Sequence, residues 1–324
     1  MIRHCFWEYF PTVFVLLVFF NAAGFADTIA EKSFDVTAGG TLIIESDLGT
    51  INVETSAQQR VNVKVVSEKR SWRGYDTDVA KRLTVDFQKD GNDVIVKAWL
   101  KKKHNWHGGN SRVTFIVTVP QNFNVDLQTG GGSVSVGDLA GKVRARTSGG
   151  SLNFGHISGP VKGHTSGGSI TVESCDGDVD ITTSGGSISL GDVNGEVNVR
   201  TSGGSISIEK AEGSVFARTS GGSINVEEVM GDIEVRTSGG SVKAYISKQP
   251  KGHCRLETSG GSVTVYLADN IGVDVEASAS SGRVISDFDI DGREKKNYVN
   301  GKINGGGPDL YLHTSSGKVK IRRM

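Results

Sequence analysis

Apolar and polar residues alternate along the second half of the chain in a pattern that repeats at a fixed interval. In the unit that begins at Thr201, Ile206 and Ile208 alternate with polar residues, and Val215 and Ala217 alternate with Phe216 and Arg218. Ala211 is an isolated apolar position between the two runs. Alternation with a period of two is typical of a β-strand buried on one face. Each unit is therefore predicted to form two strands of about four to six residues, with the isolated position forming a short third wall.

The unit recurs every 18 residues and is marked by the string Thr-Ser-Gly-Gly-Ser. A degenerate copy, Thr129-Gly-Gly-Gly-Ser133, precedes six evenly spaced copies, and a seventh follows a three-residue insertion; the seven copies occupy 147–151, 165–169, 183–187, 201–205, 219–223, 237–241 and 258–262. Such self-similarity indicates a repeat architecture, in which stacked units lie about 4.8 Å apart and share one apolar core. The predicted fold is all-β, a single-chain parallel β-solenoid with 18-residue coils that is right-handed by the crossover rule.

The chain before the repeats divides into two predicted parts. Residues 1–26 resemble a signal peptide, because the apolar stretch 13–20 is followed by the small residues Gly24 and Ala26 before a cut at Asp27. A retained anchor is the alternative. Residues 27–127 are predicted to form an N-terminal β-rich cap with longer excursions, and residues 128–324 to form the solenoid repeats and a C-terminal cap.

Four strands are predicted within the N-terminal cap. Asp90-Gly-Asn is a plausible turn of a hairpin between two of them. The predicted strands span residues 61–66, 83–87, 94–99 and 113–119.

Composition adds an excess of glycine and a balance of charge. The 324 residues include 44 Gly, with 36 Lys and Arg against 36 Asp and Glu. A neutral chain argues against nucleic acid as a partner, since nucleic-acid binders normally carry a basic excess. We expect the glycines to occupy the corners of the solenoid, where a positive φ costs them nothing sterically.

The sequence offers few groups for catalysis or metal binding. Histidines are scattered, and no nucleophile elbow, calcium repeat or phosphate loop is present. Cys175 and Cys254 lie in apolar columns about four units apart, roughly 19 Å, which is too far for a disulfide. We therefore predict buried thiols, no catalytic residues, no metal site and no cofactor.

Two polar rows follow from stacking the units, and each has two interpretations. The serine-rich row could contact sugars or ice, or could only solvate the sheet through hydrogen-bonded ladders. The arginine-rich row could meet an anionic polymer, or could pair with acidic residues of adjacent units. The first row contains Ser133, Ser151, Ser169, Ser187, Ser205, Ser223 and Ser241, and the second contains Arg146, His164, Thr182, Arg200, Arg218 and Arg236.

Aromatic and cationic residues gather in the N-terminal excursions and form the candidate ligand site. Such residues can stack on sugar rings and pair with phosphate or carboxylate groups. The alternative is a cap in which tryptophans cover the solenoid end and lysine stems shield an edge strand. The candidate residues are Trp72, Arg73, Tyr75, Trp99, Lys101, Lys102, Lys103 and Trp106.

The junction with the repeats carries a resemblance to a known family. Residues 118–152, TVPQNFNVDLQTGGGSVSVGDLAGKVRARTSGGSL, continued by the TSGGSI units, resemble the bacterial "putative adhesin" family. The resemblance covers residues 40–324 and implies an exported protein of β-strand repeats with a domain of unknown function. It implies no catalytic residues for this chain.

Together these features predict a non-enzymatic, exported protein of the periplasm, the cell surface or the medium. It would be an adhesin-like scaffold that displays a repetitive polar β face to a glycan or an anionic envelope polymer. No transmembrane segment is expected after signal cleavage, and the solenoid ends could mediate self-association. The alternatives are a β-helix polysaccharide lyase or hydrolase, which would need irregular loops with clustered Asp, Lys and Arg, and an ice-binding protein.

Overall fold

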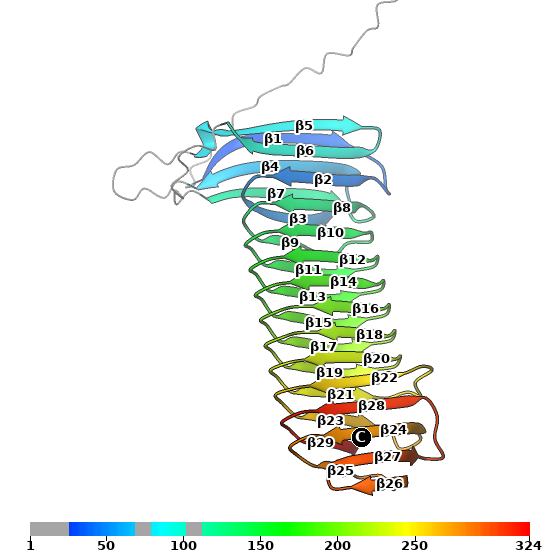
Figure 1. Ribbon diagram of the computed structural model, residues 1–324. Helices are drawn as coiled ribbons and strands as arrows, with labels where there is room; N and C mark the ends of the chain where they lie inside the picture. The colour runs from blue at the N-terminus through cyan, green and yellow to red at the C-terminus, as the bar shows by residue number, and fades with distance from the viewer. Residues whose placement is uncertain (1–25, 69–78, 102–111) are drawn as a thin grey trace, which may run out of the picture.

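The computed structural model describes residues 26–68, 79–101 and 112–324. The predicted signal peptide, apart from Ala26, lies outside these residues. The described chain is almost entirely β, with 29 strands and one short 3-10 helix, η1 (Val79–Lys81). The strands form two long sheets that face each other along the whole stack (Figure 1). An all-β fold of mainly parallel sheets is thereby confirmed.

Sheet A contains 14 strands of the described chain and receives the first strand of every repeat unit. From the N-terminal end of the stack its order is β1 (Ala26–Asp35), β4 (Arg60–Glu68), β7 (Arg112–Pro120), β3 (Thr50–Ser56), β9 (Val134–Val136), β11 (Leu152–Ile157), β13 (Ile170–Cys175), β15 (Ile188–Val193), β17 (Ile206–Ala211), β19 (Ile224–Val229), β21 (Val242–Ile246), β23 (Val263–Leu267), β29 (Val319–Arg323) and β25 (Val284–Ser286).

Sheet B contains 15 strands of the described chain and receives the second strand of every unit. From the same end its order is β5 (Leu83–Asp90), β6 (Asp93–Leu100), β2 (Thr41–Ser46), β8 (Asn124–Thr129), β10 (Val143–Thr147), β12 (Val161–Thr165), β14 (Val179–Thr183), β16 (Val197–Arg200), β18 (Val215–Arg218), β20 (Ile233–Thr237), β22 (Cys254–Thr258), β28 (Asp309–Thr314), β24 (Val273–Ala279), β27 (Tyr298–Ile303) and β26 (Asp291–Lys295).

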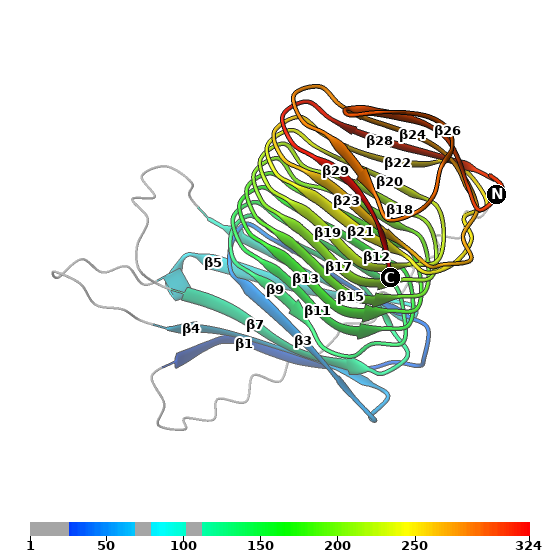
Figure 2. The same cartoon turned by 90° about the horizontal axis from the view of Figure 1, so that it is seen from below.

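Strand pairing in the repeats is parallel and follows the 18-residue period. Val143 lies opposite Val161, which lies opposite Val179 and then Val197. Each inward side chain therefore packs on the same position of the next unit, and the inward faces of both sheets form one continuous buried core. Figure 2, seen from the C-terminal end, shows the two layers of strands that enclose this core.

From β11 onward the predicted third wall is not a separate element, whereas in the unit before it Leu139 lies outside β9 and forms an isolated parallel bridge with Ile157. The isolated apolar position is the last residue of the sheet A strand: Cys175 ends β13, is buried, and pairs with Ile157 and Val193. Two consecutive residues, Glu173 and Ser174, lie outside the core just before it. These two residues interrupt the alternation of apolar and polar positions. The sequence pattern therefore predicts a separate third wall at Cys175, although this residue continues β13.

The predicted reason for the turn glycines is also wrong. In the described chain, positive φ values occur at seven glycines, none of which lies in the seven Thr-Ser-Gly-Gly-Ser turns. The second glycine of each turn instead lies against the backbone of the preceding unit. A Cβ built at Gly186 would be 2.1 Å from the carbonyl oxygen of Gly168, and one at Gly204 would be 2.1 Å from that of Gly186. Close stacking of the turns, rather than left-handed backbone, requires glycine here.

The threonine of each Thr-Ser-Gly-Gly-Ser turn links that turn to the preceding unit through hydrogen bonds. The buried Thr201 Oγ1 donates a hydrogen bond of 2.8 Å to the carbonyl oxygen of Gly186 and accepts a bond of 3.3 Å from the Gly204 N–H. The same pair of bonds recurs at Thr219 and Thr237. The hydroxyl supplies partners to backbone groups that would be costly to bury without them.

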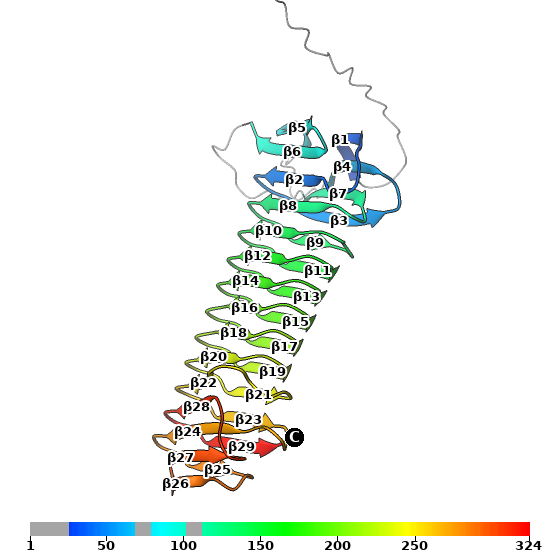
Figure 3. The ribbon, with the colours of Figure 1, turned by 90° about the vertical axis from the view of Figure 1, so that its right-hand side faces the viewer.

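Two units lie out of sequence order at the ends of the stack. The unit of β2 and β3 lies between β6/β7 and β8/β9, with Ser46 opposite Thr129. The last unit, β28 and β29, lies between β22/β23 and β24/β25, so that Thr314 pairs with both Thr258 and Ala279. Figure 3 shows these terminal units continuing the same two sheets.

The strands predicted before the repeats are confirmed. The four predicted segments correspond to β4, β5, β6 and β7, and the turn at Asp90 joins β5 and β6 as an antiparallel hairpin. Gly91 in this turn has a φ of 55°, a conformation that favours glycine. Among the described residues there is no helix with the length and apolar character needed to cross a membrane.

Facing core positions compensate each other in size. Phe154 of β11 is fully buried, and the inward position of β12 in the same unit is Gly163. A Cβ at Gly163 would lie 3.3 Å from Leu152 Cδ1 and 3.6 Å from Phe154 Cε2, so these side chains leave little room for a larger residue. Neighbouring units carry Ala145 and Ile181 at the position of Gly163.

Both described cysteines are free and buried, as predicted. Burial raises the pKa of the Cys254 thiol from 9.0 to about 11. The native state therefore retains a proton that the unfolded chain releases between these values, and folding stability falls as pH rises through this window. Below pH 9 both states hold the proton and this group has no effect.

We expect wild type to lose up to about 3 kcal/mol more stability than Cys254→Val between pH 9 and 11. Valine suits the column, because Val215 and Ile233 occupy the equivalent positions in other units. Urea unfolding at several pH values measures the difference between the two proteins. Parallel stability curves for the two proteins would show that the thiol does not titrate in this way.

Candidate functional site

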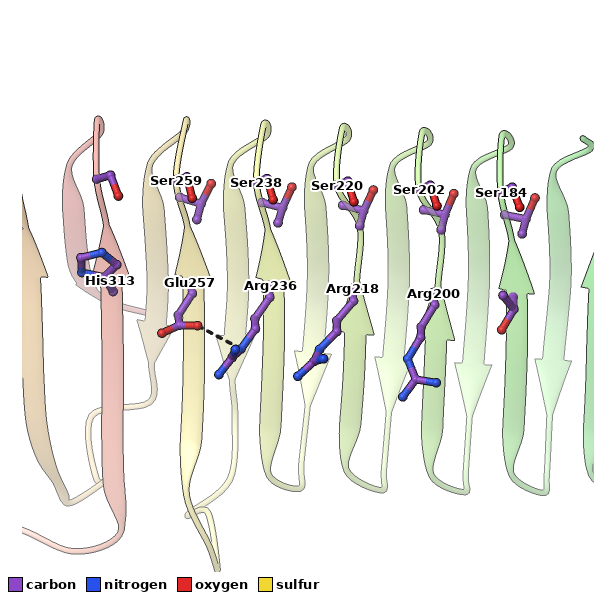
Figure 4. Close-up of a pocket in the computed structure, with 17 residues that line it drawn as sticks. Ser184, Arg200, Ser202, Arg218, Ser220, Arg236, Ser238, Glu257, Ser259 and His313 are labelled. Carbon is purple, nitrogen blue, oxygen red and sulfur yellow. Dashed lines mark ion pairs between the residues drawn. The ribbon is translucent and has the colours of Figure 1, made fainter. Parts of the chain in front are cut away.

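A shallow groove of about 620 Å³ runs along the outer face of sheet B beside the Thr-Ser-Gly-Gly-Ser turns. Figure 4 shows its two rows of side chains, an arginine row below and a serine row at the turns. We call this the Arg–Ser groove. Its rows are Arg200, Arg218 and Arg236, and Ser184, Ser202, Ser220, Ser238 and Ser259, with Glu257 and His313 at one end.

The local sequence explains why these side chains share one face. In the run Arg200, Thr201, Ser202 the threonine points into the core, so the residues on either side point outward. The same run recurs at Arg218 and Arg236. Parallel pairing places each arginine opposite the next, at the strand spacing of about 4.8 Å.

Acidic residues balance one end of the arginine row. Glu234 Oε1 lies 2.9 Å from Arg218 Nη2, and Glu257 Oε2 lies 2.9 Å from Arg236 Nε. Glu257 also pairs with Arg255 of the neighbouring column at 2.6 Å. The predicted alternative, in which arginines pair with acidic residues of adjacent units, is therefore correct for Arg218 and Arg236.

Arg200 differs from the other two arginines. It is exposed, and it makes no ion pair with any residue of the described chain. Thr182 lies opposite it on one side and Arg218 on the other, and Asn198 takes the place that Glu234 has two units later. The groove is thus most positive around Arg200.

The serine-rich row on the sheet A side is engaged in a ladder of hydrogen bonds. Ser187 Oγ accepts a bond of 3.2 Å from the Ser205 N–H, and Ser205 Oγ accepts one of 3.2 Å from the Ser223 N–H. The same bond links Ser133 to Ser151. These contacts support the interpretation of this row as a hydrogen-bonded ladder.

The predicted aromatic and cationic cluster is only partly within the described chain. Trp99 lies on β6 with 43% of its surface exposed, and Lys101 is exposed just beyond that strand. Trp99 follows the buried Ala98, so it faces outward on the side of the Arg–Ser groove. Six strand spacings, roughly 29 Å, separate β6 from β16. The other candidates, Trp72, Arg73, Tyr75, Lys102, Lys103 and Trp106, lie outside the described residues.

Sequence reasoning missed the serine at the second position of each turn. The sequence predicts the arginine row and the row of the last motif serine as separate surfaces, and neither row includes the second-position serine. The alternation itself held the signal, because Arg200 and Ser202 are two residues apart across an inward threonine. Pairing these two columns would have identified the groove.

A Ser-His-Asp arrangement lies where the sheet A strands β11 and β13 end. His156 Nδ1 lies 2.5 Å from Ser174 Oγ, and His156 Nε2 lies 3.5 Å from Asp176 Oδ2. Such a set can activate a serine for nucleophilic attack, but it also needs a substrate pocket and oxyanion donors. His156 and Asp176 are about half exposed, and the lining of the Arg–Ser groove includes none of the three.

Within the described chain, no group of three or more His, Cys, Asp or Glu residues could hold a metal ion.

The two facing sheets of stacked parallel strands define a class of all-β repeat proteins. The chain belongs to the Toastrack DUF4097 family, whose model matches residues 41–322. The resemblance to adhesin-like proteins of unknown function is thereby confirmed. A comparison with functionally curated proteins finds no match.

Several solved structures are similar to this chain. A protein of Clostridium sporogenes described as a "putative cell adhesion protein" is 13% identical, with 92% of this chain and 100% of that chain covered and a TM-score of 0.25. A "putative adhesin" of Bacteroides fragilis is 12% identical, with coverages of 91% and 96% and a TM-score of 0.26. Another "putative adhesin", from Parabacteroides distasonis, is 9% identical, with the same coverages and a TM-score of 0.36. Values this low carry no argument about a ligand.

Proposed function

We propose that the protein is a non-enzymatic, exported adhesin-like scaffold of the cell envelope or surface. In this proposal the repeat region is a single β-solenoid with 18-residue coils, and the Arg–Ser groove is its binding surface. The ligand is a chain-like anionic molecule, such as an acidic glycan or an envelope polymer.

The shape of the Arg–Ser groove is the observation that supports this proposal. The groove crosses successive strands from β14 to β28, so it extends along the stack instead of closing around a compact ligand. Every strand step presents a similar outward position and a turn serine, at a spacing of about 4.8 Å. A repeating surface of this kind suits a repeating ligand.

The charge of the groove favours an anionic ligand. Three arginines line it, and Glu257 is the acidic residue among its lining side chains. Guanidinium groups recognise carboxylate, sulfate and phosphate through paired hydrogen bonds. The exposed Trp99 on the same face provides a stacking surface for a sugar ring in this proposal.

The test is a binding array of the purified full-length protein against polysaccharides and envelope polymers, in acidic and neutral versions of the same backbone. We expect binding to acidic polymers that weakens as salt is raised, because exposed charges are screened. Trp99→Ala tests the stacking surface, and Ile116→Ala, at a residue of similar exposure on sheet A, is its control. Equal binding to the neutral versions, or depolymerisation of a bound polysaccharide, would contradict the proposal.

A further inference from the structure

Arg200 and Arg218 place two like charges opposite each other on adjacent strands. They are direct partners in the parallel pairing of β16 and β18. Like charges in this position repel and destabilise a sheet unless another group neutralises them. Between Arg218 and Arg236 that group is Glu234, which lies 2.9 Å from Arg218 and 3.6 Å from Arg236. For the pair Arg200 and Arg218 the corresponding residue is Phe216, which is uncharged, and the residue beside Arg200 on its own strand is Asn198, which is also uncharged.

Hydroxyl donors face the same part of the groove. Ser184, Ser202 and Ser220 line it together with the two arginines, and all three are exposed. Their side chains form no hydrogen bond with other groups of the described chain, unlike the serines of the ladder on sheet A. In Figure 4 the arginine side chains extend side by side below this serine row.

We propose that Arg200 and Arg218, with the hydroxyl of Ser202, form a binding site for an oxyanion, which is a carboxylate, sulfate or phosphate group. The site rests on the proposed function, because it assigns the acidic group of the polymer to one end of the groove. An oxyanion there accepts hydrogen bonds from both guanidinium groups and relieves their repulsion. Toward Arg236 the acidic residues Glu234 and Glu257 already provide this neutralisation, so the anion binds at the Arg200 end.

The matched variants are Arg200→Gln and Arg146→Gln. Both arginines belong to the same row and are exposed, but Arg146 lies three units away and outside the Arg–Ser groove. Two measurements are made on full-length protein: affinity for sulfated and carboxylated polysaccharides, and thermal stability with sodium sulfate or phosphate against sodium chloride at equal ionic strength. We expect Arg200→Gln to weaken polymer binding at least about tenfold, since two charge-assisted bonds are lost. We expect Arg146→Gln to bind as wild type does.

The two measurements separate the failure of this inference from the failure of the proposed function. If acidic polymers bind wild type and Arg200→Gln equally, the oxyanion site is wrong and the polymer function stands. If sulfate or phosphate stabilises wild type more than Arg200→Gln, yet no polymer binds, the site takes free anions and the polymer function is wrong. If no acidic polymer binds wild type, and sulfate or phosphate stabilises wild type no more than Arg200→Gln, both are overturned.

Discussion

Gly150→Ala is expected to lower the free energy of unfolding by about 3 kcal/mol, whereas Gly149→Ala in the same turn should leave it nearly unchanged. A Cβ at Gly150 would lie 2.0 Å from the carbonyl oxygen and 2.2 Å from the carbonyl carbon of Gly132. These are backbone atoms of the preceding unit, so relief requires the stacked turns to separate. A Cβ at Gly149 meets no atom within 4 Å.

The comparison is informative because neither glycine has a positive φ. Alanine therefore imposes no backbone strain at either position, and only the contact with the neighbouring unit differs. Urea unfolding of the two variants and wild type gives the free energies, and amide exchange of the turns at 129–133 and 147–151 shows whether they separate locally. Equal stability of the two variants would refute the explanation by close stacking.

Phe154→Ala is expected to cost about 3–5 kcal/mol, the range for truncating a fully buried phenylalanine. The unit has little capacity to fill the resulting cavity, because the facing residue is Gly163 and offers no side chain. Phe216→Ala is the control, since this ring is 43% exposed on the outer face of sheet B. Its removal should change stability by about 0.5 kcal/mol or less.

A double variant tests whether the two facing positions share one space. Gly163→Val alone should destabilise the protein, because the added methyl groups meet the Phe154 ring and Leu152. Combined with Phe154→Ala, the same valine fills part of the cavity, so the double variant should be more stable than the sum of the two single effects predicts. Thermal or urea unfolding of the four proteins completes the cycle. Additive effects would mean that the two positions are independent.

Much of the fold follows from the alternation of residues alone. It identified which residues of each unit are buried, the strands before the repeats and the hairpin at Asp90, because each depends on near neighbours in the sequence. The third wall was predicted wrongly because residues such as Glu173 and Ser174 interrupt a strand without ending it. The pairing of Phe154 with Gly163 could not be predicted, because it depends on how the two sheets lie across the core.

The candidate site was predictable only in part. The 18-residue repeat predicts the arginine row. The location of its uncompensated positive charge depends on which acidic side chains, from other positions of the repeat, form ion pairs with these arginines. Glu234 belongs to a different column from Arg218 and Arg236, and only the structure shows that it reaches both. The alternation of inward and outward residues is sufficient to predict that the second-position serines lie beside the arginines. The aromatic cluster stays a prediction as a ligand site for every member. The structure gives the positions of Trp99 on β6 and of Lys101 just beyond it, about 29 Å from the Arg200 strand.

The position of the unit formed by β28 and β29 has a consequence for the order in which the strands of the stack can assemble. Since β28 and β29 lie between pairs of strands that precede them in the sequence, residues 309–324 fill an internal gap instead of extending an end. Until they arrive, β22 and β24 have no shared partner, and each presents an open strand edge. Assembly therefore cannot finish by simple growth from one end to the other. Loss of residues 309–324 would split the ladder internally, so the integrity of the whole stack depends on strands that follow β22 to β25 in the sequence.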